Sequence, residues 1–446
     1  MLEDKNSWHD EWHSIYVSDP NIDNSETLKR FWGDKGDHFL TEFYPPLYLF
    51  LLKFFFKIFG YVDDYGRFFS LIFGVLVVPC SMYLAKFFTN SKKNIFLIGI
   101  FLSTNLFLIW QSLEIRAHLL VVFINLINII LFLEMIKSKT LIKSSVYFLV
   151  SLFNISLWPI SGLIFVGKSF YLLKEVLEKK QNYSIFVLFF LILVAYIFLN
   201  FDYLKFNLAR DFHYTSFSKT FFYNFHFRSF FGSIFVGGIF LLSFAYLVIK
   251  NYKIIIFQNL KEDILFYIIS STYLLTIIYS LIRAPIMSPK YVIFVIPLIL
   301  IWTVLKVSKL KNSNFFLIIL FSVSCLNLYN INDFPIKRPE TKVALKKIVD
   351  SNDSKYIFTK ENDVFKNYLK TKKIYQQNNL ELIKYEELSM IKTFWYFCLN
   401  NPRFAYGDAK LKTHQKCKLF DNKSNFLLLS EFKFPDIIIK KYIFTD

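Results

Sequence analysis

Between residues 66 and 331 the chain alternates long apolar runs with short clusters of charged residues. Most runs are about as long as a helix that crosses the hydrocarbon core of a bilayer, which needs roughly 20 residues. We therefore expect about ten membrane-spanning helices, near residues 66–88, 94–110, 115–136, 143–158, 160–175, 183–201, 230–249, 264–283, 291–308 and 313–331. Two of the runs meet at Trp158 and Pro159, which predicts either a tight turn between two helices or a kink within one long helix.

The segments that connect the runs differ in charge. Five of them carry lysine with little acid to offset it: 90–93, 137–143, 174–180, 250–253 and 306–311. Lysine-rich loops stay on the cytoplasmic side of a membrane, so we assign these five to the cytoplasm. The segments expected on the outer side are then 1–65, 111–117, 158–160, 202–229, 284–290 and the chain after about residue 332.

The sequence has 52 Lys and Arg against 34 Asp and Glu, which gives a net charge of +18. In a soluble protein an excess of this size would indicate a nucleic-acid partner. Here much of it falls in the short loops between spans, where membrane orientation accounts for it. We therefore expect membrane lipids, and no nucleic acid, among the partners of this chain.

Residues 1–44 are polar and fall on the expected outer side. A tail of this length needs a preceding span to carry it across the membrane, and we expect that span upstream of Met1. The expected domains are a first outer loop with an interfacial helix (1–65), a transmembrane helical domain (66–331) and an outer domain (332–446).

The stretch Tyr44–Gly60 is apolar but shorter than the roughly 20 residues that a membrane-spanning helix needs. Within it, Lys53 and Lys57 lie one helical turn apart. This pattern predicts an amphipathic helix that lies in the outer interface and is begun by Pro45 and Pro46. The alternative is a true span, but a span here would reverse every later loop against the lysine pattern.

After residue 331 short mixed segments replace the long apolar runs. PETKVALKKIVD (339–350) and FKNYLKTK (365–372) predict helices, whereas KYIFTK (355–360) and FLLLSEF (426–432) predict strands. The fold class is therefore a mostly α, polytopic membrane protein with a small α/β extracytoplasmic domain at its C-terminus. Cys398 and Cys417 both fall in this domain, and an oxidising outer compartment makes them candidates for a disulfide.

Near the start of the chain, NSWHDEWHSIY places four ionisable side chains within five positions. Asp10 and Glu11 form an acidic pair in which one carboxylate can hold a substrate while the other accepts a proton from a hydroxyl. Two alternatives stay open. The segment can be a solvated tail, or His9, Asp10 and His13 can bind a metal, although their spacing matches no established ligand motif.

Two further outer segments carry candidate side chains. Glu42 lies three residues before Pro45, where it can face the same cavity as the acidic pair or simply favour the start of a helix. QSLEIR (111–116) forms a very short turn between two spans. Charges so close to the bilayer usually face protein or a polar cavity, where Arg116 can hold a phosphate by a forked hydrogen bond. The alternative is a local pair with Glu114 that anchors the turn.

The later outer loops carry several cations that can bind an anionic lipid headgroup. They are Arg210, His213, His226, Arg228, Arg283 and Lys290. The alternative is that their side chains only reach for the membrane interface, which is common for lysine and arginine.

Four segments follow one another in an order and spacing that is known from one group of enzymes. They are WHDEWHS (8–14), YPPLYLFLLKFFFKIFG (44–60), RFFSLIFGVLVVP (67–79) and QSLEIRAHLL (111–120). Together they resemble the polyprenyl-phosphate-sugar-dependent membrane glycosyltransferases of the GT-C fold. That group includes the protein O-mannosyltransferases, the lipid A aminoarabinose transferases and the bacterial lipopolysaccharide-core transferases, the last being the most similar.

The resemblance is close over residues 8–137, and SPKYVIFVIP (288–297) is similar to the start of a late span in the group. In the group an acidic pair is followed by His-Pro-Pro-Leu-Tyr, Arg-x-x-Ser and a Gln-Glu-Ala-Arg turn. The corresponding positions here are Asp10–Glu11, Tyr44–Tyr48, Arg67–Ser70 and Gln111–Arg116. This sequence departs from the pattern in having Tyr44 for histidine, Leu113 and Ile115 in the turn, Lys290 for arginine, and no first span.

The resemblance implies an inverting transfer of a hexose or pentose from a polyprenyl-phosphate donor to a hydroxyl of a cell-envelope glycan, lipid or protein. It places the reaction on the periplasmic face of the bacterial inner membrane. By position, the implied roles are catalysis for Asp10 and Glu11; shaping of the donor and acceptor sites for Glu42, Tyr44, Pro45, Pro46, Gln111 and Glu114; and binding of the lipid phosphate for Arg116, Lys290, Arg210 and Arg228. No cofactor is assigned, and a divalent metal stays open because some members of the group are described with one.

Three other functions compete with this interpretation. A transporter or flippase of lipid-linked glycans would also be polytopic and basic, but it needs neither the acidic pair nor a folded C-terminal domain. An O-antigen polymerase or ligase would carry a larger loop between its late spans than 202–229. A relative that binds a lipid-linked sugar without transferring it is favoured by the absent first span.

Overall fold

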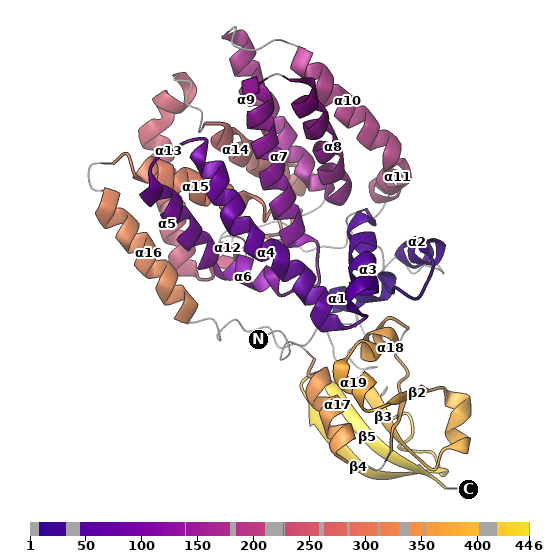
Figure 1. Ribbon diagram of the computed structural model, residues 1–446. Helices are drawn as coiled ribbons and strands as arrows, with labels where there is room; N and C mark the ends of the chain where they lie inside the picture. The colour runs from indigo at the N-terminus through magenta and orange to yellow at the C-terminus, as the bar shows by residue number, and fades with distance from the viewer. Residues whose placement is uncertain are drawn as a thin grey trace. The chain divides into compact units, whose positions relative to one another are not determined.

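The apolar runs form helices and the C-terminal segment forms a sheet with helices in the computed structural model of the chain (Figure 1). The structure describes residues 9–32, 45–138, 140–178, 184–209, 226, 228–257, 263–282, 286–310, 313–329, 339–351, 354–361, 363–400 and 417–445. The chain divides into two compact units. The mixed unit comprises Met1–Thr41, Leu49–Phe69 and Pro335–Asp446, and the helical unit comprises Glu42–Tyr48 and Ser70–Phe334.

The helical unit contains all the expected spans. Its elements are α4 (Asp63–Lys86, from Ser70 onward), α5 (Lys92–Ser103), α6 (Leu106–Ser112), α7 (His118–Ser138), α8 (Leu141–Leu157), η1 (Pro159–Ser161), α9 (Gly162–Leu177), α10 (Ser184–Leu199), α11 (Phe201–Ala209), α12 (Arg228–Phe231), α13 (Ile234–Phe257), α14 (Asp263–Ile282), α15 (Val295–Val307) and α16 (Ser313–Tyr329). Each expected span coincides with one of these helices or with a pair of them, so the predicted helical fold class is confirmed.

The helices are shorter than the apolar runs suggested. Of the described helices, three are long and apolar enough to cross a membrane alone: Asp63–Lys86, His118–Ser138 and Ile264–Ile282. A fourth results if α5 and α6, which meet at 59°, are one broken span. The break arises because the Asn105 side chain caps α6 by accepting a hydrogen bond from the Leu108 amide at 3.0 Å.

Three connections differ from, or decide between, the expected ones. Trp158 is extended and ends α8, and Pro159 begins η1, so the turn is present and the single kinked helix is not. The segment 250–253, expected as a cytoplasmic loop, lies inside α13. The start of the expected outer loop 202–229 is helical, because α11 covers it.

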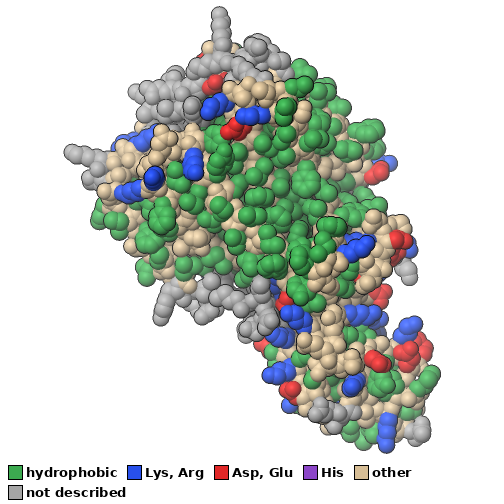
Figure 2. Space-filling model, in the orientation of Figure 1, with side chains coloured by type: hydrophobic (Ala, Val, Ile, Leu, Met, Phe, Trp, Pro, Cys, Tyr) green, Lys and Arg blue, Asp and Glu red, His purple; other side chains and the backbone are tan. Residues whose placement is uncertain are grey.

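Hydrophobic side chains cover much of the surface of the helical unit, whereas charged side chains are denser over the mixed unit (Figure 2). Leu141, Phe198, Leu242 and Ile282, on four different helices, are each more than 70% exposed. Apolar surface of this extent is not typical of soluble monomers and is what a lipid-facing surface requires. The apolar surface seen in Figure 2 is therefore consistent with the helices that are long enough to cross a membrane.

Inside the helical unit, polar side chains of α7, α8 and α9 bond to one another. The Lys168 ammonium donates to the Asn128 side chain, and Asn128 Nδ2 donates to Ser151 Oγ at 2.8 Å. Three aromatic rings surround the ammonium at 4.9 to 5.1 Å from their centroids, those of Phe132, Tyr147 and Phe165. These contacts give the buried Lys168 nitrogen hydrogen-bond and aromatic partners in a place where lipid offers none.

On the neighbouring position of α9, Gly167 lets α9 approach α14 closely. A Cβ at Gly167 would lie 2.5 Å from the Ile268 Cα atom, which is backbone and cannot rotate away. Small residues at helix contacts in membranes allow this kind of close backbone approach. The α9–α14 contact therefore depends on the absence of a side chain at this position.

The mixed unit joins three short helices, the first turns of α4 and the C-terminal segment. Its elements are α1 (His9–Val17), α2 (Asn24–Trp32), α3 (Leu47–Phe59), α17 (Thr341–Asp350), β1 (Tyr356–Phe358), α18 (Asp363–Lys370), α19 (Lys373–Gln377), β2 (Glu381–Ile383), η4 (Tyr385–Met390), β3 (Thr393–Leu399), β4 (Phe426–Phe434) and β5 (Ile437–Phe444). The strand order is β2-β1-β3-β5-β4, with β1 parallel to β2 and β3, and β5 antiparallel to β3 and β4.

The expected elements of this unit are present. The predicted interfacial helix is α3, which begins directly after Pro45 and Pro46, and the helices and strands predicted after residue 331 are α17, α18, β1 and β4. The predicted small α/β domain is therefore confirmed. These predictions did not include α1 and α2 in the first loop, or the strands β2, β3 and β5.

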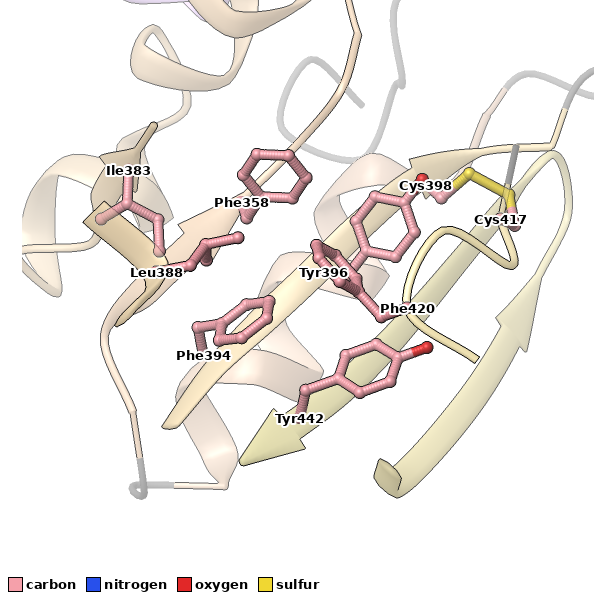
Figure 3. Close-up of a cluster of buried hydrophobic side chains, with 9 residues drawn as sticks. All are labelled: Phe358, Ile383, Leu388, Phe394, Tyr396, Cys398, Cys417, Phe420 and Tyr442. Atoms are coloured by element: carbon pink, nitrogen blue, oxygen red, sulfur yellow. A yellow bond between two sulfur atoms is a disulfide. The ribbon is translucent and has the colours of Figure 1, made fainter. Parts of the chain in front are cut away.

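The sheet is buried on both faces around β3. Phe394 and Tyr396 face a cluster that also includes Phe358, Phe420 and Tyr442 (Figure 3). On the other face Phe397 contacts Phe365 of α18, with ring centroids 5.7 Å apart. This packing explains why β3 reads as a continuous apolar run instead of alternating apolar and polar residues.

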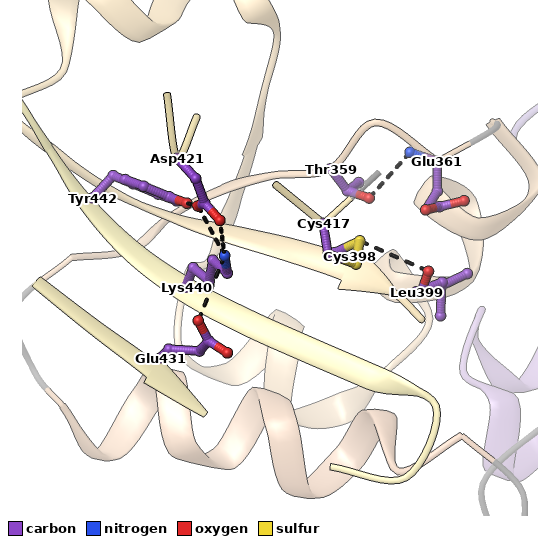
Figure 4. Close-up of a disulfide and its surroundings, with 9 residues drawn as sticks. All are labelled: Thr359, Glu361, Cys398, Leu399, Cys417, Asp421, Glu431, Lys440 and Tyr442. Atoms are coloured by element: carbon purple, nitrogen blue, oxygen red, sulfur yellow. Dashed lines mark hydrogen bonds and ion pairs between the residues drawn. A yellow bond between two sulfur atoms is a disulfide. The ribbon is translucent and has the colours of Figure 1, made fainter. Parts of the chain in front are cut away.

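A disulfide joins Cys398 of β3 to Cys417, the pair that the sequence analysis singled out (Figure 4). Nearby, Asp421 accepts hydrogen bonds from the Lys440 ammonium at 2.7 and 2.8 Å and from the Tyr442 hydroxyl at 2.5 Å. Burial alone would raise the pKa of Asp421, but the bonds from Lys440 and Tyr442 lower it by more, so this pKa lies below its ordinary 3.8.

We predict that Gly167→Ala destabilises the protein by about 1–3 kcal/mol, because the new methyl group must push the α14 backbone away. The matched control is Gly162→Ala at the start of the same helix, where nothing lies within 4 Å of the added Cβ. Thermal unfolding of both variants in detergent checks this. Equal stability of the two variants would contradict the close contact.

A second prediction concerns acid. Because the pKa of Asp421 is lowered by folding, its bonds stabilise the sheet at neutral pH and are lost as the pH falls through that lowered pKa, below about 3.8. Hydrogen exchange of β5 should therefore be faster in Asp421→Asn than in wild type at pH 7. At each pH both proteins are compared directly, and the difference should shrink below pH 4. A difference that persists unchanged in acid would show that Asp421 acts by packing alone.

Candidate functional site

The acidic pair lies in the first turn of α1, and its two members face different surroundings. Asp10 is exposed, whereas Glu11 is only 1% exposed. Next to Glu11, the buried Trp12 ring packs against Phe365 and Tyr368 of α18, with centroids 4.9 and 5.1 Å away. The segment is therefore a seated helix and not a solvated tail. One carboxylate is open to solvent, and the other points into the protein.

The buried member of the pair lies close to a buried ion group formed by Asp63, Arg67 and Lys372. The Asp63 carboxylate accepts from the Lys372 ammonium at 2.6 Å and from the Arg67 guanidinium at 3.2 Å. The carboxylate of Glu11 acts electrostatically on Arg67 as well. Arg67 thus pairs with two carboxylates of its own helix, Asp63 at 3.2 Å and Asp64 at 3.6 Å, and the Glu11 carboxylate on α1 acts on it as well.

The charge on Lys372 is favoured by this environment. Burial alone would lower the pKa of Lys372, but the neighbouring Tyr368 and Asp63 raise it by more, so this pKa lies above its ordinary value. The ion group therefore keeps a positive charge on the C-terminal segment at every physiological pH. Its surroundings compensate the cost of burying that charge.

Further hydrogen bonds tie the same elements together. The Tyr61 hydroxyl bonds to the Ile15 carbonyl at the end of α1, 3.0 Å away, and to the Asn367 side chain of α18. Asn367 Nδ2 in turn donates to the Asp19 carboxylate at 3.1 Å. The C-terminal end of the helix that carries the acidic pair is consequently held by Tyr61 and by Asn367 of α18.

In α3, the helix predicted to be interfacial, Lys53 and Lys57 differ in their exposure. The Lys53 ammonium is nearly buried and bonds to the Asp23 carbonyl at 2.9 Å and the Thr27 hydroxyl at 2.8 Å, whereas Lys57 is exposed. Burial lowers the pKa of Lys53. Lys53 therefore connects α3 to α2 instead of marking a polar outer face.

In the helical unit, the turn between α6 and α7 buries every polar side chain that was singled out there. Gln111, Glu114 and Arg116 are each less than 10% exposed. The His118 ring, through Nδ1, hydrogen-bonds the Gln111 side chain, and Ser70 Oγ donates to the Arg116 carbonyl at 3.4 Å. Charges in this turn face protein, as expected for charged groups so close to the bilayer.

Two other segments expected on the outer side meet this turn. The Trp158 ring packs edge-on against His118, 5.7 Å between centroids, and Trp158 Nε1 donates to the Tyr291 carbonyl at 3.0 Å. The Lys290 ammonium lies 5.6 Å from the centroid of the Tyr291 ring. A chain of contacts thus runs from Gln111 through His118 and Trp158 to Tyr291, which is next in sequence to the half-buried Lys290.

The other predicted residues are placed as follows. Pro45 is buried and Pro46 half-buried immediately before α3. Arg228 is exposed at the start of α12. Glu42, Tyr44 and Arg210 lie outside the described residues.

Within the described part of the chain, no three His, Cys, Asp or Glu side chains are grouped so that they could hold a metal ion. His13 is buried on α1, and the side chain of His9 is outside the description. A metal bound by His9, Asp10 and His13 therefore stays a hypothesis.

Sequence reasoning gave no structural role to several residues that organise these sites. Asp63 and Arg67 are spaced i, i+4, which is a signal for a pair on one helix. Lys372 gives no such signal, because it lies 309 residues from its partner in the chain. The role of Trp158 was equally hidden, since its partner Tyr291 is in a distant loop.

No family model matches this chain, and no curated protein matches it either. Among solved structures, the chain is similar to ArnT from Cupriavidus metallidurans bound to undecaprenyl phosphate, with a TM-score of 0.60 and 10% identity over 99% of this chain and 95% of ArnT. For ArnT in the apo state the TM-score is 0.59, again at 10% identity, over 98% of this chain and 94% of ArnT. The chain has a GT-C-like fold. The resemblance drawn from four sequence segments is confirmed at the level of the fold.

The GT-C-like fold and the apolar helices together make this a multi-pass membrane protein. The similarity extends over almost the whole of both chains, so the mixed unit and the helical unit both have counterparts in ArnT. At 10% identity the likeness concerns the path of the chain and not the chemistry of individual side chains.

We predict that Trp158→Phe destabilises the helical unit by about 1–3 kcal/mol, because it leaves the buried Tyr291 carbonyl without its donor. The matched control is Trp302→Phe, at an equally buried tryptophan whose Nε1 has no hydrogen-bond partner among the described residues. Thermal unfolding in detergent compares the two. If the Trp302 change costs as much, the effect comes from ring size and not from the hydrogen bond.

Proposed function

We propose that the protein is an inverting glycosyltransferase that moves a sugar from a polyprenyl-phosphate donor to a hydroxyl of a cell-envelope acceptor. The observation that carries the proposal is the GT-C-like fold over 99% of the chain, shared with an ArnT structure bound to undecaprenyl phosphate. The four sequence segments that resemble this group of enzymes support it independently of the fold. The reaction is assigned to the periplasmic face of a bacterial inner membrane.

In the proposed reaction the exposed Asp10 carboxylate is the general base. An acceptor hydroxyl oxygen attacks the anomeric carbon of the donor, and its proton passes to Asp10. The bond between the anomeric carbon and the phosphate oxygen breaks, and its electron pair leaves with the polyprenyl phosphate. Attack from the side opposite the leaving group inverts the anomeric configuration. The solvent exposure of Asp10 supports this role, because a base must reach an acceptor that arrives from outside.

Glu11 has a supporting role in this proposal. It is buried and lies near Arg67, so it is the member of the pair better suited to hold α1 in place than to accept protons from a substrate. Two adjacent carboxylates with different surroundings are a common way to divide such roles in an active site. Glu42, Tyr44, Pro45 and Pro46 are assigned to the shape of the donor and acceptor sites on the resemblance alone.

The leaving phosphate carries negative charge that a cation must stabilise. We assign this to Arg116 and Lys290, with Arg210 and Arg228 as further candidates. The contacts that run from the 111–116 turn to Tyr291, next in sequence to Lys290, support the first two. Preorganised charge at a developing anion is usually the largest single contribution to catalysis. Gln111 and Glu114 complete this turn.

The test measures release of free undecaprenyl phosphate from a panel of undecaprenyl-phosphate sugars in membranes that carry the protein and a crude envelope extract as acceptor. We expect turnover by wild type, and a loss of about 10²- to 10⁴-fold in Asp10→Asn, because the general base is removed. Arg116→Gln should weaken donor use as well. Asp363→Asn is the matched control, since Asp363 is an exposed acid at the start of α18 whose side chain is 81% exposed.

Each alternative function predicts a different outcome. Donor binding without release by any variant would contradict catalysis and favour a relative that only binds lipid-linked sugars. Movement of intact donor across vesicle membranes would favour a transporter. Turnover that is unchanged in Asp10→Asn would retain a transferase but remove Asp10 from its mechanism.

A further inference from the structure

The buried ion group links the acidic pair to the C-terminal segment. Asp63 accepts hydrogen bonds from Arg67 on its own helix and from Lys372, which follows α18. The Asp63 amide also donates to the Thr371 carbonyl at 3.3 Å, so backbone and side chain are both fixed at this point. The side chains of Asp63, Arg67 and Lys372 are all less than 10% exposed. Water therefore does little to weaken the attraction between them.

Packing carries the same link to α1. The Lys372 ammonium lies 4.7 Å from the centroid of the Tyr368 ring, and Tyr368 stacks on Trp12 with a centroid distance of 5.1 Å and an angle of 26° between planes. Trp12 directly follows Glu11 in α1. A path of contacts therefore runs from Lys372 through Tyr368 and Trp12 to the acidic pair, and Arg67, which shares Asp63 with Lys372, acts electrostatically on Glu11.

Lys372 decides how Arg67 divides its charge. With Lys372 present, the Asp63 carboxylate has two cations, so Arg67, which also pairs with Asp64 at 3.6 Å, remains available to the buried Glu11. Without that ammonium, Asp63 would keep only Arg67 as a close cation within the group and would draw the guanidinium toward itself. Glu11 would then be buried beside a cation already engaged elsewhere, which is an unfavourable state for a carboxylate.

We propose that Lys372 is a positioning residue for the acidic pair: it balances Asp63 so that Arg67 can hold Glu11, and thereby fixes Asp10 at the surface of α1. This inference rests on the proposed transferase function for its catalytic consequence. It implies that the C-terminal segment helps to position the acidic pair of the proposed active site. Lys372 touches neither substrate nor reacting atoms.

The test combines charge removal with charge compensation. Lys372→Met leaves Asp63 in excess, whereas the double variant Asp63→Asn/Lys372→Met removes both charges and restores the balance between Arg67 and Glu11. Lys372→Arg keeps the charge at the same place. Lys366→Met on α18 is the matched control, because the Lys366 side chain is 42% exposed and pairs with Asp363 at the surface.

With the undecaprenyl-phosphate sugar that wild type consumes, we expect Lys372→Met to lower turnover by about 10- to 100-fold, the range that a small misplacement of a catalytic group produces. The double variant and Lys372→Arg should recover most of this loss, and Lys366→Met should behave as wild type. Recovery in the double variant would show that the effect of losing Lys372 comes from the uncompensated charge of Asp63.

A second readout needs no substrate. Hydrogen exchange of the α1 amides, residues 9–17, should be faster in Lys372→Met and return toward wild type in the double variant. If neither wild type nor any variant turns over a donor, but the exchange pattern is as expected, the proposed function fails and the positioning link stands. If wild type turns over donor, and Lys372→Met keeps full activity and unchanged α1 exchange, the positioning link is overturned while the proposed function stands. Loss in Lys372→Met without recovery in the double variant would also overturn it.

Discussion

A buried carboxylate, Asp63, constrains the mixed unit more than any other single group. A charge removed from water must find partners of opposite charge, and removing one partner of such a buried pair typically costs about 3–5 kcal/mol. Asp63 finds Arg67 one turn along its helix and Lys372 from the far end of the chain. The segments that carry these three groups must therefore assemble, and α1 is seated against α18 where they meet.

In the helical unit, buried polar groups must likewise be paired, but here the surrounding medium is lipid instead of water. In lipid no water can satisfy a polar group, so each one must be paired inside the protein. The Lys168 side chain donates a hydrogen bond to Asn128 and is surrounded by three aromatic rings. Trp158 Nε1 donates to the Tyr291 carbonyl. These pairs fix which helices are neighbours. Packing of apolar side chains alone would specify this weakly, since lipid tails are as apolar as leucine.

Much of the fold follows from the sequence, because long apolar runs can only be stabilised as helices in a bilayer. The exceptions are instructive. The break at Asn105 comes from one capping side chain within an apolar run. The helices α1, α2 and α11 have only nine residues each and lie in segments that were expected as loops. The strand β3 is buried on both faces and lacks the alternation that marks a half-buried strand.

The candidate site shows where sequence reasoning stops. The adjacent acids Asp10 and Glu11 were found because they stand together in the chain, yet nothing in their order tells which one is exposed. That difference arises from partners that are distant in the sequence. Arg67 lies more than fifty residues after Glu11, and α18 lies beyond residue 360. A pair of equal side chains becomes an unequal pair only through tertiary contacts. The division of labour between base and anchor is therefore a property of the fold, and the four sequence segments supply the chemistry that the fold arranges.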